Sequence, residues 1–434
     1  MKHNTQIRNS IENGCVCLGF LILCSTGLAQ TAIHVHKKIT VNEAIQQALN
    51  NSRKMESLAT NTQIAEYRYD SSGKLNNPEL RYKEESHRSF LKDINEKRLG
   101  IRWRPPRIGE LSEDRQQARV EVWDRKVDEI RYRHQLVARV RRSYTSVLMY
   151  DALAELEKSR LALEDERIKV INQMVALGRR SVVYQTKARM WHAESQNDYL
   201  RAQQNQRLAR RKLARRCGIS ENVALSPYDI GFPKITMGLD SLSVLAFQNR
   251  PEINLVTQRI RLAEKQKHYE TMKLLPWPAF VEYSYRLDRD KNNDDWDESR
   301  ERFRELRVGI DLPIFDWNVG NIKATRLAVK RKEGQSEAVR EGLEDEVRDT
   351  YHIYMDLLLD WQNFSRDAEL MISDAEAIIN ETGTHQTLMP DEVYEMELTL
   401  IDTRKLLCQK RRDLAHSLIE LCFVLGLESP DLLQ

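Results

Sequence analysis

The chain has 434 residues, of which 31% are charged and only 7% are aromatic, and its formal net charge is +3. This composition is too polar for an ordinary multidomain globular protein, while 11 Pro and 16 Gly are too few for a disordered chain. The near-neutral balance gives no sign of nucleic-acid binding, which needs a strongly basic face. Abundant Glu, Arg, Lys, Leu and Ala instead indicate long, solvated helices.

Residues 1–29 have the features of a secretory signal peptide. A positively charged start precedes the short apolar run Cys15–Cys24, and small residues occupy positions −3 and −1 before Gln30. The run is too short to span a membrane. A lipoprotein site at Cys24 is the lesser alternative, because Leu23 stands where a small residue belongs. We therefore expect a mature chain that begins near Gln30.

The first half of the chain is predicted to combine long helices with one pair of strands. Thr40 and Glu43 form a capping box, in which each side chain satisfies a free backbone amide of the other residue. Two short runs of alternating apolar and polar residues indicate strands with one apolar and one polar face. The expected order is a helix at 40–74, strands near 80–83 and 99–104, a long helix at 110–177, a turn at Gly178 and a helix at 181–217.

The second half repeats this order. Pro78 and Pro276 precede the first strands and lie 198 residues apart, and Gly178 and Gly383 follow the long helices and lie 205 residues apart. Landmarks that keep their order and spacing indicate a tandem duplication. The second set comprises a helix at 241–274, strands at 280–287 and 306–312, a long helix at 320–379 and a helix at 391–425. We divide the chain into a first repeat (30–222), a linker (223–237), a second repeat (238–428) and a tail (429–434).

Both long helices carry apolar residues at alternating spacings of four and three, which predicts coiled-coil packing. A helix of about 68 residues spans ~100 Å. This equals the combined length of a returning helix and the first helix of the other repeat, so we expect four helical columns with the strands at one end. The expected inward residues are Leu156, Leu163, Val170 and Leu177, then Val347, Tyr351, Tyr354, Leu358, Trp361, Ser365, Ala368, Ile372, Ala375 and Ile379.

The strands leave two possibilities open, a soluble half-buried sheet and a membrane barrel. Four strands cannot close a barrel, and open sheet edges are not tolerated in lipid. Three chains would supply twelve strands, an even number as in bacterial outer-membrane barrels. In that case the charged segments 84–97 and 288–301 are the cell-exterior loops, and Asn293 is exposed outside the cell.

At this point the sequence resembles the TolC-like outer-membrane efflux family, over the whole mature chain. The resemblance rests on NPEL at 77–80, LPIFDWNVGNI at 312–322, the glycine turns and the duplication. It is greatest to the shorter members that serve heavy-metal and drug efflux pumps. The resemblance implies a homotrimer in the outer membrane of a Gram-negative bacterium, with a twelve-stranded β-barrel and a long periplasmic α-helical tunnel. It also implies docking to a periplasmic adaptor and an inner-membrane pump, without indicating the substrate.

The expected fold class is therefore mainly α with a small β part, and the expected function is an efflux duct. The alternative is a periplasmic coiled-coil adaptor-type protein. That class would explain export and helical hairpins, but not two junctions of strand, proline and long helix. We expect no enzyme, cofactor or metal site, because no nucleophile elbow, phosphate loop or metal-ligand cluster occurs in the sequence.

Two groups of residues are candidate sites at the hairpin ends. Some family members carry an acidic residue six positions after each tip glycine, as part of a ring that closes the pore. Tyr184 and Met389 stand there in this sequence, and Asp391 and Glu392 are the nearest carboxylates, so these four form the candidate pore constriction. The expected adaptor-docking residues are Leu177, Gly178, Arg179, Arg180, Ser181, Gly383, Thr384 and His385.

Overall fold

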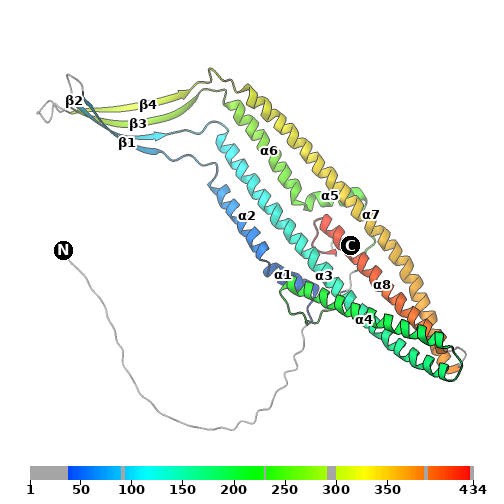
Figure 1. Ribbon diagram of the computed structural model, residues 1–434. Helices are drawn as coiled ribbons and strands as arrows, with labels where there is room; N and C mark the ends of the chain where they lie inside the picture. The colour runs from blue at the N-terminus through cyan, green and yellow to red at the C-terminus, as the bar shows by residue number, and fades with distance from the viewer. Residues whose placement is uncertain (1–37, 89–92, 229–230, 291–299, 386–389, 431–434) are drawn as a thin grey trace, which may run out of the picture. The chain divides into compact units, whose positions relative to one another are not determined.

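The computed structural model describes residues 38–88, 93–228, 231–290, 300–385 and 390–430 (Figure 1). They belong to one compact unit, Lys38–Gln434. The described residues form long helices and one four-stranded sheet, and the element order α-α-β-β-α-α occurs twice. The predicted fold class, mainly α with a small β part, is confirmed. Among the helices of this described part, none combines the length and the apolar character that a membrane crossing requires.

The first half contains one more helix than expected. The capping box is present, with Thr40 N donating to Glu43 Oε2 at 2.9 Å and Glu43 N donating to Thr40 Oγ1 at 3.3 Å. The expected single helix at 40–74 is wrong, because Ser52 is extended and its hydroxyl accepts from Met55 N, which starts a second helix. The elements are α1 (Val41–Asn50), α2 (Arg53–Ser71), β1 (Glu79–Arg88), β2 (Asp93–Trp103), α3 (Glu110–Ala176) and α4 (Val182–Cys217).

The second half shows the same break. Arg250 is extended and Pro251 is the first residue of the next helix, so the expected single helix at 241–274 is again two. Gly383 lies inside a helix that ends at His385, and the expected turn at this glycine is therefore wrong. Residues 386–389, between α7 and α8, lie outside the described residues. The elements are α5 (Leu239–Asn249), α6 (Pro251–Met272), β3 (Trp277–Asp290), β4 (Arg300–Asp311), α7 (Val319–His385) and α8 (Pro390–Val424).

The sheet has the order β1-β2-β3-β4 and is antiparallel throughout. Its strands are longer than expected. Glu84 pairs with Lys97 and Asp288 pairs with Glu301, so most of segment 84–97 and both ends of segment 288–301 are strand, not loop. The backbone pairing continues through these charged positions even where like charges face each other, as at Glu85 and Glu96. Residues 89–92 and 291–299, including Asn293, lie outside the described residues.

The two faces of the sheet differ as the alternation predicts. One face is apolar and open to solvent in the single chain, and nine of its residues are at least 40% exposed. The opposite face carries charged side chains that pair with one another. The exposed apolar residues are Leu80, Tyr82, Leu99, Ile101, Tyr283, Tyr285, Leu306, Val308 and Ile310.

The helices lie side by side in a fixed order. Next to the sheet, α3 contacts α2 and α6, and α6 contacts α7. Toward the other end, α3 contacts α4 and α8, and α8 contacts α7 (Figure 1). Two shorter helices thus follow one another along each long helix, as the helix lengths predict.

The inward stripe is correct for α7 and shifted for α3. Val347, Tyr354, Leu358 and Ala368 of α7 are buried, and the other six predicted positions are half-buried. On α3, the predicted leucines at 156 and 163 are half-buried and Leu177 is 68% exposed. This helix packs between α4 and α8 and buries positions facing both. Its buried residues near the hairpin end are Ala154, Glu157, Glu164, Arg167 and Ile171.

Two tyrosines anchor the two long helices to the linker. Tyr144 of α3 is fully buried, with its hydroxyl 2.7 Å from the carbonyl oxygens of Ile39 and Ser226. Tyr354 of α7 is also fully buried and donates to the Pro233 carbonyl at 2.8 Å. Burial raises the pKa of Tyr144 to about 12. The two long helices therefore have equivalent residues at the same level of the molecule.

Candidate functional site at the hairpin end of the helices

The turn between α3 and α4 is built on Gly178. This glycine has φ +71°, a left-handed conformation that L side chains rarely adopt. Arg179 N donates to Met174 O at 2.8 Å and Gly178 N donates to Val175 O at 3.0 Å. These two bonds are the Schellman pattern that closes a helix C-terminus. Ser181 then caps α4, since its hydroxyl accepts from Tyr184 N.

Apolar side chains are exposed around this turn. Leu177 is 68% exposed, and Val182 and Val183 are 66% and 68% exposed. Arg179 is exposed beside them. Leu177 and Arg179 are among the docking residues expected from the sequence, but the two valines are not. The valines are exposed because they lie in the first turn of α4.

A buried ionic cluster lies just behind the turn, which we call the Arg167 cluster (Glu164, Arg167, Tyr184, Asp391 and Glu395). Arg167 Nε donates to Asp391 Oδ1 at 3.0 Å, and Arg167 Nη2 donates to Glu395 Oε1 at 3.1 Å. The Tyr184 hydroxyl donates to the other oxygen of Asp391. Glu164 Oε1 lies 3.6 Å from Arg167 Nη1. The cluster joins α3, α4 and α8, and thus both halves of the chain.

Three charges of this cluster are held away from water, whereas the Glu395 side chain is 61% exposed. The side chains of Arg167, Glu164 and Asp391 are 5%, 3% and 7% exposed. Burial raises the pKa of Glu164. Burial acts to lower the pKa of Arg167, but its bonds to Asp391 outweigh that effect and the pKa is raised. Breaking such a buried pair by removing one partner costs roughly 3–5 kcal/mol.

Two further side chains connect the cluster to the turn. Arg180 Nη2 lies 3.6 Å from Asp391 Oδ2, and its guanidinium stacks over the Tyr184 ring at 4.8 Å. The Arg167 guanidinium lies over the Trp191 ring at 4.6 Å. Arg180 therefore differs from Arg179, because it participates in the cluster. The arrangement can act as a reversible polar lock between helices.

The structure brings Tyr184 and Asp391 of the candidate constriction together. Glu392 lies next to them as an exposed residue in the first turn of α8, and Met389 is outside the described residues. Gly383, Thr384 and His385 form the last residues of α7. The sequence analysis missed Glu164, Arg167, Trp191 and Glu395. Charged residues at inward positions of α3 were the available signal, but their partners could not be found without the packing.

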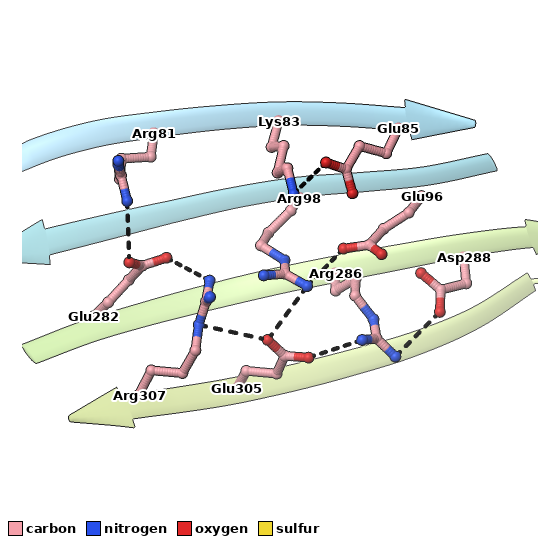
Figure 2. A network of polar contacts seen from close by, with 10 residues as sticks. All are labelled: Arg81, Lys83, Glu85, Glu96, Arg98, Glu282, Arg286, Asp288, Glu305 and Arg307. Atoms are coloured by element: carbon pink, nitrogen blue, oxygen red, sulfur yellow. Dashed lines mark hydrogen bonds and ion pairs between the residues drawn. The ribbon is translucent and has the colours of Figure 1, made fainter. Parts of the chain in front are cut away.

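The polar face of the sheet forms a second group of charges (Figure 2). Glu282 is 3% exposed and has three arginines around it: Arg307 at 2.6 Å, Arg102 at 3.0 Å and Arg81 at 3.6 Å. Glu305 lies 3.0 Å from Arg286 and 3.7 Å from Arg98. Lys83 pairs with Glu85, Arg98 with Glu96, and Arg286 with Asp288. These pairs link all four strands on one face.

Within the described residues, no group of three or more His, Cys, Asp or Glu side chains is placed to hold a metal ion. Cys217 and Cys422 are buried thiols, and burial raises the pKa of Cys217 to about 11. A thiol with so high a pKa is a poor nucleophile at neutral pH.

Solved structures of outer-membrane proteins and membrane channels are similar to this fold. A structure of CusC, described by its conformational changes on folding and transmembrane channel formation, has 16% identity and a TM-score of 0.70, with 89% of this chain and 92% of that chain covered. The outer-membrane protein VceC of Vibrio cholerae has 15% identity and a TM-score of 0.66, with 89% and 96% covered. The open-state MtrE outer-membrane channel of Neisseria gonorrhoeae has 14% identity and a TM-score of 0.65, with 89% of each chain covered.

These similarities span nearly the whole of each chain, so this protein has the fold of these channels. The expected combination of long helices and four strands in one chain is confirmed, while the trimer and its barrel stay predictions. No protein-family profile matches the sequence, and no curated protein matches it either.

Proposed function

We propose that this chain is the outer-membrane duct of an efflux system, which passes substrates from a periplasmic adaptor and inner-membrane pump to the cell exterior. The sheet carries this proposal. Its apolar face is exposed along all four strands, while its other face is charged and ion-paired. Such a sheet suits lipid on one side and water on the other.

A homotrimer follows from the edges of the sheet. Within the described residues, β1 and β4 each have one neighbouring strand, so each leaves an edge unpaired there. Unpaired backbone groups are too costly in lipid, and three copies pool twelve strands into a closed barrel. The long helices α3 and α7, each of 67 residues, then extend ~100 Å into the periplasm of a Gram-negative cell.

The hairpin end is the proposed adaptor-docking surface. It lies at the far end of α3 from the sheet, where a partner from the inner membrane can reach. Leu177, Val182 and Val183 offer apolar contact, and Arg179 offers an exposed positive charge. Gly383, Thr384 and His385 are the corresponding proposed residues of the second half.

The Arg167 cluster is the proposed gate element. It ties the first hairpin to α8 through Asp391, and it contains Tyr184 and Asp391 of the proposed pore constriction. An adaptor that binds the Arg180 guanidinium would compete with Asp391 for it. In this mechanism the helices at the hairpin end separate when the ion pairs of Asp391 are exchanged, and no covalent bond is made or broken.

Cell fractionation tests the membrane assignment. The mature protein, with an N-terminus near Gln30, should sediment with outer membranes. The purified protein should form ion-conducting pores after reconstitution into planar bilayers. Recovery as a soluble periplasmic protein would contradict the duct.

Substitutions at the turn test docking. Arg179→Glu with Val183→Asp should abolish export and leave the protein in the outer membrane at its native amount. Arg180 stays unchanged, since altering it would also disturb Asp391. The matched control is Arg189→Glu, an exposed arginine further along α4. Normal export by the double variant would rule out docking at this surface.

A further inference from the structure

The helices α4 and α7 lie on opposite sides of the molecule at the hairpin half. α4 packs on α3, α7 packs on α8, and α3 and α8 pack on each other. Each of these outer helices therefore has a flank that faces away from its own chain. The two flanks are the places where another copy can pack.

The charges of these two helices are opposite. α4 contains nine basic and two acidic residues. Between residues 346 and 376, α7 contains eight acidic and two basic residues. The two helix segments therefore carry large net charges of opposite sign, although the whole chain has a net charge of only +3.

The charges gather on the outward flank of each helix. Exposed aspartates of α7 recur at spacings of seven and eleven, on the side opposite its buried residues Val347 and Tyr354. On α4, exposed basic residues lie opposite the buried Ala209 and Leu213. We call Asp349, Asp356, Asp367 and Asp374 the acidic stripe, and Arg201, Arg211, Lys212 and Arg215 the basic stripe.

The basic stripe is poorly neutralised by its own chain. Arg211 has Glu221 at 3.2 Å and Arg201 has Asp198 at 3.9 Å, but no ion pair is found for Lys212 or Arg215 among the described residues. Beside Lys212, a groove of about 370 Å³ is lined by Arg139, Arg142 and Arg216 and by no acidic side chain. Burial lowers the pKa of both Arg142 and Arg216, and the nearby Arg139 lowers it further, while Arg142 also pairs with Glu420.

The two stripes also lie at the same level. Arg210 of α4 bonds to Asp151 of α3, and Arg216 bonds to the Arg139 carbonyl, so α4 residues 206–216 run beside α3 residues 139–151. Because Tyr144 and Tyr354 are equivalent anchors, the matching stretch of α7 is about 349–361. This stretch holds Asp349 and Asp356.

We propose that the basic stripe of one copy docks against the acidic stripe of the next copy of this chain. The contact is heterologous, with different surfaces on the two copies, and such contacts form a ring when the rotation between neighbouring copies closes. It rests on the proposed function for the number of copies, which the strand count sets at three. The attraction between the stripes steers the copies into register, and salt weakens it because charges are screened beyond ~3 Å at 1 M ionic strength.

Charge reversal in the full-length protein, purified in detergent, tests the docking. Asp349→Lys with Asp356→Lys should weaken the trimer at 0.15 M salt. The protein concentration at which half of the chains are trimeric should rise at least tenfold. Adding Arg211→Glu and Arg215→Glu should restore the trimer. The matched control, Glu333→Lys with Glu337→Lys, changes the same charge on the half of α7 beside α6 and should assemble as the unaltered protein does.

Disulfide trapping gives a second readout that does not depend on stability. Arg215→Cys with Asp349→Cys should give disulfide-linked oligomers up to the trimer. Arg215→Cys with Asp374→Cys should not, because residues 349 and 374 are about 38 Å apart along one helix. If the charge-reversed variants form trimers like the unaltered protein and the cysteine pair does not cross-link, the ionic docking is wrong. The proposed duct function would not be affected by that result. A chain that remains monomeric would overturn both.

Discussion

At the level of single residues, the hairpin end depends on one carboxylate. Asp391 is buried and receives bonds from Arg167 and Tyr184, with Arg180 nearby. Removing Arg167 leaves this charge without its main partner. A buried charge without a partner destabilises the folded protein far more than a neutral side chain at the same position does.

We predict that Arg167→Leu destabilises the hairpin end by roughly 3–5 kcal/mol and that Arg167→Leu with Asp391→Asn loses much less. Limited proteolysis at the α3–α4 turn, with thermal melting, measures the loss. In planar bilayers the single variant should conduct more than the unaltered protein. Additive effects of the two substitutions would show that the pair is not coupled.

Buried histidines predict a pH dependence. Burial lowers the pKa of His416 of α8, whose Nε2 lies 3.3 Å from the Arg142 carbonyl. The unfolded chain therefore binds a proton that the folded chain resists. Stability should fall as the pH drops below the unfolded value of about 6.5, by at most about 1.4 kcal/mol per pH unit for this residue. His416→Gln should flatten the melting temperature between pH 7 and pH 5, and an unchanged slope would contradict this.

At the level of elements, the α3–α4 turn requires the left-handed conformation of Gly178. No atom lies within 4 Å of the position of an added Cβ, so the cost of a side chain is conformational and not steric. We predict that Gly178→Ala destabilises the turn by about 1 kcal/mol. Gly334→Ala is the matched control, because this glycine lies inside α7 with free space around it and alanine should stabilise the helix by about 0.5–1 kcal/mol. Equal effects on thermal melting would refute the argument.

At the level of the whole molecule, the apolar face of the sheet should contact lipid. Val308 is 52% exposed in the middle of β4. We predict that Val308→Arg lowers the amount of assembled protein in the outer membrane, because arginine on a lipid face costs roughly 2–4 kcal/mol at the bilayer midplane. Val308→Ile is the control and should insert normally. Normal insertion of the arginine variant would place this face in water.

Much of the fold could be read from the sequence because it depends on local periodicity. Alternation in 280–287 and 306–312 identified both strands and their apolar faces, and the spacing of Val347, Tyr354 and Leu358 identified the buried side of α7. The helix breaks at Ser52 and Pro251 had local signals in a capping serine and a proline, and were still missed. The signal peptide, the duplication boundaries, the trimer and the adaptor contact stay predictions.

The tertiary structure alone decided the ionic sites. Arg167 and Asp391 are 224 residues apart and meet only because α3 packs against α8. The same packing moved the buried side of α3 away from its leucines, since a helix between two neighbours buries residues toward both. A single sequence records which side chains a segment carries, whereas the low dielectric that makes a charge pair matter arises only when distant segments exclude water together.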